Sequence, residues 1–505
     1  MHGLIISVLL CLIALTSASV IPNKYNAERN ELLTQEDELF LGGKLKLTED
    51  EENVNDILMH WKREEVDESF ANPENYNFSK HFFRYRNDVS KSKVYQIIKK
   101  MPKGAVLHVH ASMMLDTDSL LRLTYEDHLY ACYGDGHLQL RFADTVPAQS
   151  CPFKWELLSD LRNSSGDVEA FDAELRKHLT LYTDDKKLQD SDINDTWKRF
   201  EKVYDVVSAI IHYRPVREKF IYESLKYFYD DNVMYVEIRS GLHNLYELDG
   251  TVHDRMYFAT LYEKVTNEFI RDYPDFVGIK FILTSGRWKS PEMVRRTLEL
   301  ARKLKAEKPK FFAGFDLVGQ EDLGRPLSDF LPVLMEAKKD MDFFFHGGET
   351  NWFGTTTDEN LVDAVLLGSK RIGHAYALIK HPVILSAVKQ RDIALEVNVI
   401  SNVVLSLVRD VRNHPLASYL AMGLPVVLSS DDPGAWEADP LSHDFYVAFV
   451  GIASRQGDLR MLKQLAFNSI IYSALDDHGK NRLISVFNKR WSEFVKYVLS
   501  QHSWA

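Results

Sequence analysis

Eight short runs of apolar and β-branched residues recur from residue 105 onward, and most are separated by amphipathic helical stretches. They are AVLHVH (105–110), VMYVEIR (233–239), VGIKFILT (277–284), FAGFDLVG (312–319), FFFHGGE (343–349), RIGHA (371–375), IALEVNVIS (393–401) and PVVLSSDD (425–432). Strands that are apolar nearly throughout are typical of a parallel sheet covered by helices. Eight such units close a (β/α)8 TIM-type barrel of the α/β class, which we predict here. The alternative, an open doubly wound sheet, usually has a Gly-rich first turn that this chain lacks.

Two amphipathic helices are predicted outside the repeating units. The first begins where Thr48 and Glu51 have the spacing of a capping box. Its apolar residues then share one face: Val54, Ile57, Leu58 and Trp61. This stripe must be buried, either on the main domain or against a second subunit, and we favour the second subunit. The other helix closes the chain and carries the apolar residues Leu483, Phe487, Trp491, Phe494, Val495 and Val498.

Roughly 120 residues separate the first and second runs, which is far more than one βα unit needs. This insertion contains both cysteines that follow the first 20 residues, and an aromatic-rich helix that begins at Trp197 (WKRFEKVY) and includes Glu201. We expect a disulfide-pinned lobe at residues 123–182, followed by helices that cover the mouth of the barrel. The barrel itself is then expected at residues 101–122 and 183–505, after a helical region at residues 20–100.

The amino-terminal residues predict export from the cell. Residues 4–15 (LIISVLLCLIAL) form an apolar core of twelve residues, followed by the small residues Thr16, Ser17, Ala18 and Ser19. This pattern is typical of a secretory signal peptide at residues 1–19. Twelve residues are too few to span a bilayer, and no later stretch is apolar for long enough. We therefore expect a secreted, extracellular protein without a membrane span.

Cysteines and glycosylation motifs agree with export. Cys132 and Cys151 would pair in an oxidising compartment, which stabilises the fold by on the order of 3 kcal/mol; two free buried thiols are the alternative. Acceptor motifs for N-linked glycans occur at Asn77, Asn163 and Asn194. The net charge of −12 argues against a polyanion-binding surface, and therefore against nucleic acid as a partner.

Polar residues end four of the apolar runs, at the face where barrel enzymes assemble their sites. The motifs are HVH (108–110), HGGE (346–349), GHA (373–375) and SSDD (429–432). Each motif alone is weak, because a lone histidine is often a core residue and Asp-Asp-Pro-Gly is an ordinary turn. Together they offer imidazoles and carboxylates for a zinc ion, and further groups that can move protons. The joint pattern predicts a hydrolytic zinc site.

Five segments resemble the secreted adenosine deaminase-related growth factors, the type 2 adenosine deaminases. They are MPKGAVLHVH, GFDLVGQED, FFFHGGET, RIGHAYAL and SSDDP, in the order found in that family. The resemblance runs from about residue 25 to the C-terminus. It implies a barrel with one catalytic zinc per subunit, a dimerisation region at residues 20–100 and a receptor-binding role for the lobe at residues 123–182. A homodimer and a cell-surface receptor or glycosaminoglycan are therefore expected partners.

The resemblance also implies a role for each motif residue. The zinc ligands would be His108, His110, His346 and Asp431. Glu349 would protonate N1 of a purine, and His374 would orient and deprotonate the water on the zinc. Substrate contacts would come from Trp197, Glu201, Gly319 and Asp432. A neutral carboxylic acid at Glu349 requires dry surroundings, since burial raises the pKa of a carboxyl group.

Two positions depart from the family pattern, and both are expected to contact the sugar of the substrate. Ala111 follows the second histidine where active relatives usually carry an aspartate, and Gly286 stands where a substrate-contact histidine is expected. Each change removes a polar contact worth about 1–3 kcal/mol. We therefore expect weaker affinity for adenosine or a shifted nucleoside preference.

The function favoured by these observations is extracellular, zinc-dependent deamination of adenosine or 2′-deoxyadenosine to inosine or deoxyinosine and ammonia. One alternative is a secreted growth-factor glycoprotein with weak or no catalysis. Another is a deaminase with an altered purine nucleoside preference. Nucleotides are disfavoured as substrates because nothing cationic is evident near the barrel motifs, although a lysine from elsewhere in the fold could approach.

Overall fold

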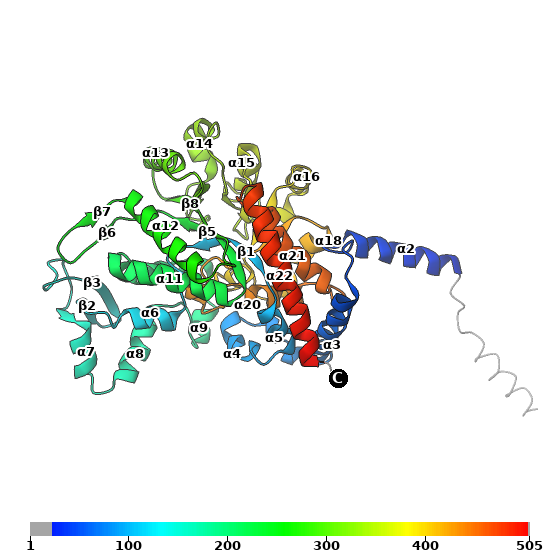
Figure 1. Cartoon of the computed structure of the whole chain (residues 1–505), viewed down its shortest axis with the longest axis horizontal. Helices are drawn as coiled ribbons and strands as arrows, with labels where there is room; N and C mark the ends of the chain where they lie inside the picture. Colours follow the sequence, from blue (N-terminus) through cyan, green and yellow to red (C-terminus); the bar gives the residue numbers. More distant parts are fainter. Residues whose placement is uncertain (1–22, 503–505) are drawn as a thin grey trace, which may run out of the picture.

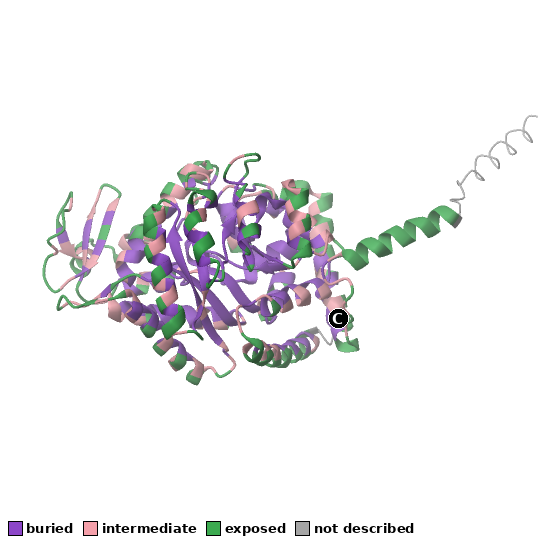
Figure 2. Ribbon diagram, turned by 90° about the horizontal axis from the view of Figure 1, so that it is seen from above, coloured by how far each residue is buried: buried purple, intermediate pink, exposed green. Residues whose placement is uncertain are grey.

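A closed barrel of eight parallel strands forms the centre of the computed structural model, which describes residues 23–502 (Figure 1). The predicted signal peptide at residues 1–19 lies outside the described residues. The strands are β1 (Gly104–His110), β5 (Val233–Ser240), β8 (Gly278–Gly286), β9 (Phe312–Val318), β10 (His346–Gly347), β11 (Arg371–His374), β12 (Ala394–Val397) and β13 (Val426–Leu428). They are buried almost throughout, as expected for strands covered by helices (Figure 2).

Two isolated pairings join two four-stranded sheets into the barrel. The strand orders are β1-β5-β8-β9 and β10-β11-β12-β13. Phe315 pairs in parallel with Phe343, and Val109 pairs in parallel with Asp431, so both open edges are closed. The predicted TIM-type barrel is therefore confirmed.

Three predicted strands are shorter than expected, and the run at 425–432 keeps only Val426–Leu428. The run at 343–349 keeps a regular strand only at His346–Gly347: Phe343 before it makes an isolated bridge to Phe315, and residues 348–349 turn into a loop. The run at 393–401 ends at Val397, and helix α17 (Val399–Val404) begins two residues later. In the run at 393–401 the apolar pattern continues past the strand because α17 is also buried, whereas in the run at 343–349 the buried apolar residues 343–345 precede the strand.

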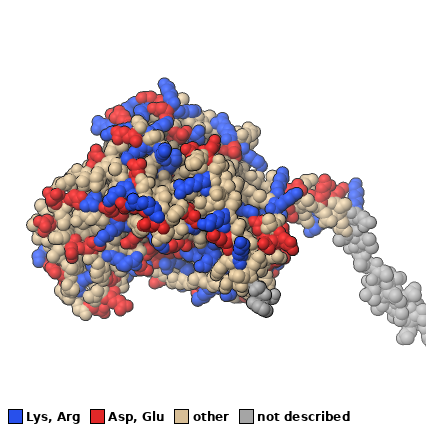
Figure 3. All heavy atoms as spheres, viewed as in Figure 1, with Lys and Arg blue, Asp and Glu red and all other residues tan. Residues whose placement is uncertain are grey.

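Helices cover the outside of the barrel (Figure 1). Those that follow barrel strands are α6 (Thr117–Leu123), α10 (Ile193–Ile211), α11 (Arg214–Asp230), α12 (Arg255–Asp272), α13 (Pro291–Glu307), α14 (Leu331–Ala337), α15 (Asn360–Leu367), α16 (Pro382–Gln390), α18 (Leu416–Ala421), α19 (Pro433–Trp436), α20 (Ser442–Tyr446) and α21 (Leu459–Ile471). The predicted closing helix is α22 (Asp477–His502), and all six of its predicted apolar residues are buried. None of the helices among the described residues is long and apolar enough to cross a membrane. Basic and acidic side chains are interspersed over the face drawn in Figure 3.

The amino-terminal helices differ from the prediction in how they are buried. Thr48 caps α3 (Glu49–Ala71) with the predicted capping box. The apolar stripe of α3 packs against this chain's own α22 and α5 (Lys93–Lys100), and Val54 and Leu58 are fully buried there. The expectation that a second subunit buries this stripe is therefore wrong, because α22 already covers it. By contrast, α2 (Asn23–Leu39) extends away from the body and is exposed (Figures 1 and 2).

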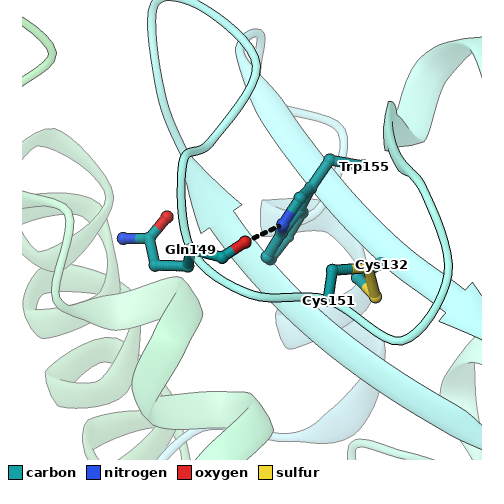
Figure 4. Close-up of a disulfide and its surroundings, with 4 residues drawn as sticks. All are labelled: Cys132, Gln149, Cys151 and Trp155. Atoms are coloured by element: carbon teal, nitrogen blue, oxygen red, sulfur yellow. Dashed lines mark hydrogen bonds between the residues drawn. A yellow bond between two sulfur atoms is a disulfide. The ribbon is translucent and has the colours of Figure 1, made fainter.

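The lobe inserted after β1 has its own small sheet. Strands β2 (Leu129–Gly134), β3 (His137–Phe142) and β4 (Trp155–Leu157) pair antiparallel in the order β3-β2-β4, beside α7 (Leu158–Ser164) and α8 (Val168–Arg176). The predicted disulfide between Cys132 and Cys151 is confirmed, and it ties β2 to the loop before β4 (Figure 4). In that loop the Trp155 indole donates a hydrogen bond of 2.9 Å to the carbonyl oxygen of Gln149.

We expect the double substitution Cys132→Ser/Cys151→Ser to destabilise the lobe by about 3 kcal/mol, because the unfolded lobe is no longer constrained by a closed loop. Hydrogen exchange should show faster exchange in β2–β4 and unchanged protection in β5 and β8. Equal exchange of the lobe in the variant and the wild type would contradict this expectation.

Candidate metal centre

Four imidazoles and a carboxylate meet at the carboxyl ends of the barrel strands. They belong to His108 and His110 at the end of β1, His346 on β10, His374 at the end of β11 and Asp431 after β13. The ring centroids of His108 and His346 are 4.5 Å apart, and those of His108 and His374 are 5.0 Å apart. His110 lies 5.4 Å from His346 by the same measure. Residues separated by more than 300 positions in the chain therefore converge on one point.

The donor atoms are close enough to hold a metal ion. Nitrogen and oxygen atoms of His108, His346, His374 and Asp431 lie within 4.8 Å of one another, and His110, Asp431 and Asp432 form a second such group. The Nε2 atom of His108 is buried and has no hydrogen-bond partner among the described residues. A buried polar atom without a partner is unfavourable, so this nitrogen fits a metal ligand better than a structural histidine.

An unusual backbone conformation orients the side chains of His374 and Asp431. His374 has φ of 62° and Asp431 has φ of 60°, in the left-handed region that non-glycine residues rarely occupy. Asp431 is held there by the closure of the barrel, since its amide donates to the carbonyl of His108 and its carbonyl accepts from the amide of His110. Strain of this kind persists where the surrounding structure enforces it, commonly at functional sites.

Two carboxylates behind the centre orient two of the imidazoles. Nδ1 of His108 donates to Glu396 over 2.9 Å, and Nδ1 of His346 donates to Asp316 over 2.6 Å. These bonds fix the tautomer in each ring and leave both Nε2 atoms facing the centre as lone-pair donors. Carboxylate–histidine pairs of this kind are a common outer layer of metal sites.

Buried arginines hold those carboxylates in turn. Arg239 donates to Asp316 over 2.8 Å and to Glu396 over 2.6 Å. Arg371 donates to Glu396 and to Glu237, both over 2.6 Å. Burial alone would raise the pKa of Asp316, but His346 and Arg239 lower it below its ordinary value, so the carboxylate stays ionised.

The sequence analysis did not predict these buried ion pairs, although the sequence contains a sign of them. Glu237, Arg239, Asp316, Arg371 and Glu396 are charged residues inside runs that otherwise predict buried strands. A charge in such a run must be paired inside the barrel. The pattern could therefore have been recognised, but not which residues pair.

Glu349 has the properties of a protonated acid. Burial, followed by the negative charges of Asp431 and Glu321, raises the pKa of its carboxyl group well above the ordinary value. Its Oε1 atom is buried without a hydrogen-bond partner among the described residues. The turn that carries it is held by Glu321, which accepts a 3.1 Å hydrogen bond from the amide of Gly348. Gly348 has φ of 75°, which suits glycine.

His374 and Asp432 flank this acid. Nδ1 of His374 lies 3.4 Å from Oε1 of Glu349, and burial lowers the pKa of the imidazole well below its ordinary value. The ring is therefore neutral and able to accept a proton. Burial and the neighbouring Asp431 raise the pKa of Asp432, whose Oδ1 atom is also buried without a partner among the described residues.

The predicted capping helix lies across the same face of the barrel. Helix α10 begins at Ile193, four residues before Trp197. The Trp197 ring contacts Phe200, whose ring lies 5.3 Å from Trp436 at the end of the helix that follows Asp432. The side chain of Glu201, one turn after Trp197, is exposed.

Trp288 was not anticipated from the sequence, and it occupies the place beside Gly286. A Cβ atom on Gly286 would lie 2.4 Å from the Trp288 ring, and one on Gly319 would lie 2.8 Å from it. The indole therefore lies against the backbone at the ends of β8 and β9, with 69% of its surface exposed. A large aromatic face thus stands at the mouth, next to the predicted substrate contact Gly319.

We expect Asp316→Asn to lower the affinity for a divalent metal by about 10- to 100-fold, because His346 loses the carboxylate that orients it. Chelator competition followed by metal analysis measures this. Asp340→Asn, the same change at an exposed residue paired with Arg302, is the matched control. Equal metal retention in both variants would contradict the role given to Asp316.

Comparisons with known proteins agree on one family. The family model described as "Adenosine deaminase" matches residues 172–490, and that described as "Adenosine/AMP deaminase N-terminal" matches residues 5–98. "Adenosine deaminase" of Aedes albopictus is 41% identical over 471 residues, covering 93% of this chain and 87% of that protein. "Adenosine deaminase 2" of Homo sapiens is 41% identical over 480 residues, covering 94% of each chain.

Solved structures with low sequence identity share the fold. An adenine deaminase from Arthrobacter aurescens has a TM-score of 0.55 at 19% identity, covering 78% of this chain and 99% of that one. An amidohydrolase from Burkholderia ambifaria with bound Zn has a TM-score of 0.54 at 18% identity, covering 81% of this chain and 95% of that one. The chain therefore belongs to the adenosine deaminase family, and the sequence-based prediction of a hydrolytic adenosine deaminase with a TIM-type barrel is confirmed.

Proposed function

We propose that this protein removes the amino group at C6 of adenosine or 2′-deoxyadenosine by hydrolysis, with one zinc ion held by His108, His110, His346 and Asp431. The observation that carries the proposal is the convergence of four histidines and Asp431 at one point, beside the buried Glu349 carboxyl group, whose pKa is raised. Three imidazoles and a carboxylate are a donor set that suits zinc.

The geometry favours His110 over His374 as a ligand. Nε2 of His108 and Nε2 of His110 lie 3.4 and 3.1 Å from the same oxygen, Oδ1 of Asp431. His374 instead approaches the other oxygen at 3.8 Å, and its second nitrogen faces Glu349. His374 is therefore placed to take a proton rather than to complete the ligand set.

Proton transfers follow from the states of Glu349 and His374. When bound, zinc lowers the pKa of a water molecule toward neutrality and so supplies the nucleophile. His374 would take a proton from the attacking water, since its Nε2 atom faces Asp431 and burial favours the neutral form of the ring. Glu349 donates its proton to N1 of the purine, which makes C6 electrophilic. The C6–O bond forms, and the proton held by His374 passes to the amino group. The C6 hydroxyl group loses its proton to the Glu349 carboxylate as the C6–N bond breaks and ammonia leaves.

The remaining predicted contacts are assigned to substrate binding. Asp432, protonated and with a free buried oxygen, is placed to hydrogen bond the purine ring. Gly319 offers a backbone contact, and Trp197 with Glu201 covers the mouth from α10. Trp288 adds an aromatic face on which the substrate can stack.

An extracellular role is part of the proposal. The Cys132–Cys151 disulfide supports folding in an oxidising compartment. Asn163 is exposed, whereas Asn77 and Asn194 are half-buried and accept hydrogen bonds of 3.2 Å from Lys80 and 2.6 Å from Gln320. We therefore propose Asn163 as the preferred glycan acceptor among the three motifs.

Two partner surfaces are also proposed. Leu32 and Leu33 are exposed on the projecting α2, which supports dimerisation through residues 20–100. A cavity of about 820 Å³ between the inserted lobe and α10 is lined by basic residues, which supports a glycosaminoglycan or acidic receptor as partner. Its basic lining residues are Arg141, Lys177, Arg199 and Lys202. A growth-factor role through this lobe is the second candidate function.

We expect Glu349→Gln to abolish deamination of adenosine while zinc stays bound, because glutamine cannot donate the required proton. Loss of the adenosine absorbance change, with about one zinc per chain by metal analysis, is the expected result. Turnover within tenfold of the wild type would contradict the role of Glu349 as the acid.

We expect Trp288→Ala to raise KM for adenosine by about fivefold with little change in kcat, since a stacking contact is worth about 1 kcal/mol. Steady-state kinetics measures both constants. Phe70→Ala, which removes an exposed aromatic ring on α3, is the control and should leave both constants unchanged. An unchanged KM in Trp288→Ala would exclude Trp288 from the substrate site.

A further inference from the structure

A cavity of about 400 Å³ lies at the amino-terminal end of the barrel. The starts of β8, β9 and β11 line it, together with the last turn of α13 and the loop that joins α21 to α22. The metal centre lies instead at the carboxyl ends of the barrel strands. We call this space the basal cavity, and its charged lining residues are Lys280, Lys305, Asp342, Lys370, Arg371 and Lys480.

Lysine side chains dominate the charge of the basal cavity. Lys280 lies near the start of β8, Lys305 in the last turn of α13, Lys370 directly before β11 and Lys480 in the first turn of α22. Asp342 is the one carboxylate among the described residues that line the cavity, and its Oδ1 atom lies 3.4 Å from Nζ of Lys370. Four ammonium groups from four segments therefore surround one carboxylate.

Arg371 does not add a free charge to the basal cavity. Its guanidinium donates to Glu237 and Glu396, both over 2.6 Å, and to the carbonyl oxygen of Tyr472 over 2.8 Å. The guanidinium carbon also lies 4.3 Å from the centroid of the Phe344 ring. Arg371 is therefore satisfied within the protein, and an anion that enters the cavity would be held by the lysines.

Three of the lysines keep unused hydrogen-bond donors. Nζ of Lys305 and Nζ of Lys480 donate to single backbone carbonyl oxygens, over 2.5 and 2.6 Å. Nζ of Lys280 lies 3.5 Å from another carbonyl oxygen. None of these three lysines forms an ion pair within residues 23–502. Since an ammonium group carries three donors, each lysine retains donors for a ligand.

The acids near Lys280 do not offset its charge. Its side chain is half-buried, and burial lowers the pKa of its ammonium group. The carboxylates that oppose this effect are Glu237, Asp342 and Asp476. Glu237 and Asp342 pair with other cations, and Asp476 accepts a 2.8 Å hydrogen bond from the amide of Gly479. An anion in the basal cavity would therefore supply the partner that Lys280 lacks.

Apolar groups form much of the remaining lining. Phe312 and Phe344 are buried, Ile471 ends α21 and Leu475 follows in the next loop. A ligand that fits such a lining has an apolar body as well as a negative charge. The volume of the basal cavity is within the range of about 300–1,000 Å³ that is usual for small-molecule sites.

We propose that the basal cavity binds a small phosphate ester, with its apolar body against the two phenylalanines and its phosphate held by Lys280, Lys305 and Lys480. A phosphate monoester carries about two negative charges at neutral pH and three acceptor oxygens, which suits several separate ammonium groups. A carboxylate carries one charge, and its planar fork is matched better by arginine. The basal cavity is separate from the metal centre, so this binding does not depend on the proposed deamination.

Calorimetry on the zinc-loaded full chain at low salt tests the proposal, with phenyl phosphate as the probe. We expect phenyl phosphate to bind at least about 10-fold more tightly than inorganic phosphate or phenol, because only the ester engages both parts of the lining. Added salt should weaken this binding, since the lysines are partly exposed. Hydrogen exchange should slow in the loop at residues 472–476 when the probe binds.

Substitutions of the lysines place the probe. Lys305→Gln and Lys480→Gln should each lower the affinity for phenyl phosphate by about 10-fold, and Lys280→Gln by at least as much. Lys303→Gln is the matched control, because Lys303 lies on the same helix as Lys305, pairs with Glu307 and does not line the cavity. Lys305→Gln alters an exposed side chain, so it decides the question even if Lys280→Gln does not fold.

Three outcomes overturn the proposal. The first is no binding of phenyl phosphate at millimolar concentration. The second is binding that the substitutions at Lys280, Lys305 and Lys480 leave unchanged, because the probe would then lie elsewhere, for example at the metal centre. The third is equal affinity for inorganic phosphate and phenyl phosphate, because the basal cavity would then hold a free anion and not an ester.

Discussion

The buried bridge that Arg239 makes between Asp316 and Glu396 is the interaction on which the metal centre depends. Each of these carboxylates holds one imidazole, so a single guanidinium sets the orientation of both His346 and His108. Breaking a buried ion pair by removing one partner is strongly destabilising, on the order of 3–5 kcal/mol. The candidate metal centre and the packing of the barrel interior are therefore coupled, because the charges inside the barrel orient the imidazoles of the centre.

Closure of the barrel completes the site. The pairing of Val109 with Asp431 joins the last strand to the first, and it brings the Asp431 carboxylate to both histidines of β1. The left-handed backbone at His374 and Asp431 is enforced by these neighbours. Burial acts in opposite directions on the two proposed proton-transfer groups: with like charge beside it, it raises the pKa of the Glu349 carboxyl group, and it lowers the pKa of the His374 imidazole.

Much of the fold was predictable because the signals are local. Apolar runs followed by amphipathic helices gave the eight strands, the Thr48 capping box marked the start of α3, and two cysteines near one another gave the disulfide. The metal-site motifs were recognisable because they end predicted strands of a barrel. One error concerned a contact across the chain, since the apolar face of α3 is covered by α22. The others concerned strand bounds: the regular strand in the run 343–349 is confined to His346–Gly347, and the run at 393–401 continues into α17.

The sequence by itself determined the barrel, the inventory of metal and proton-transfer groups, and the family. It did so because strand periodicity and the motifs depend on residues close together in the chain. Only the tertiary structure decided which charges are paired. Among residues 23–502, Arg239 pairs with two carboxylates and Arg217 pairs with none, although both side chains are buried. Partners for a charge are brought together by folding from distant segments, so pairing is a property of the packed barrel and not of any local pattern.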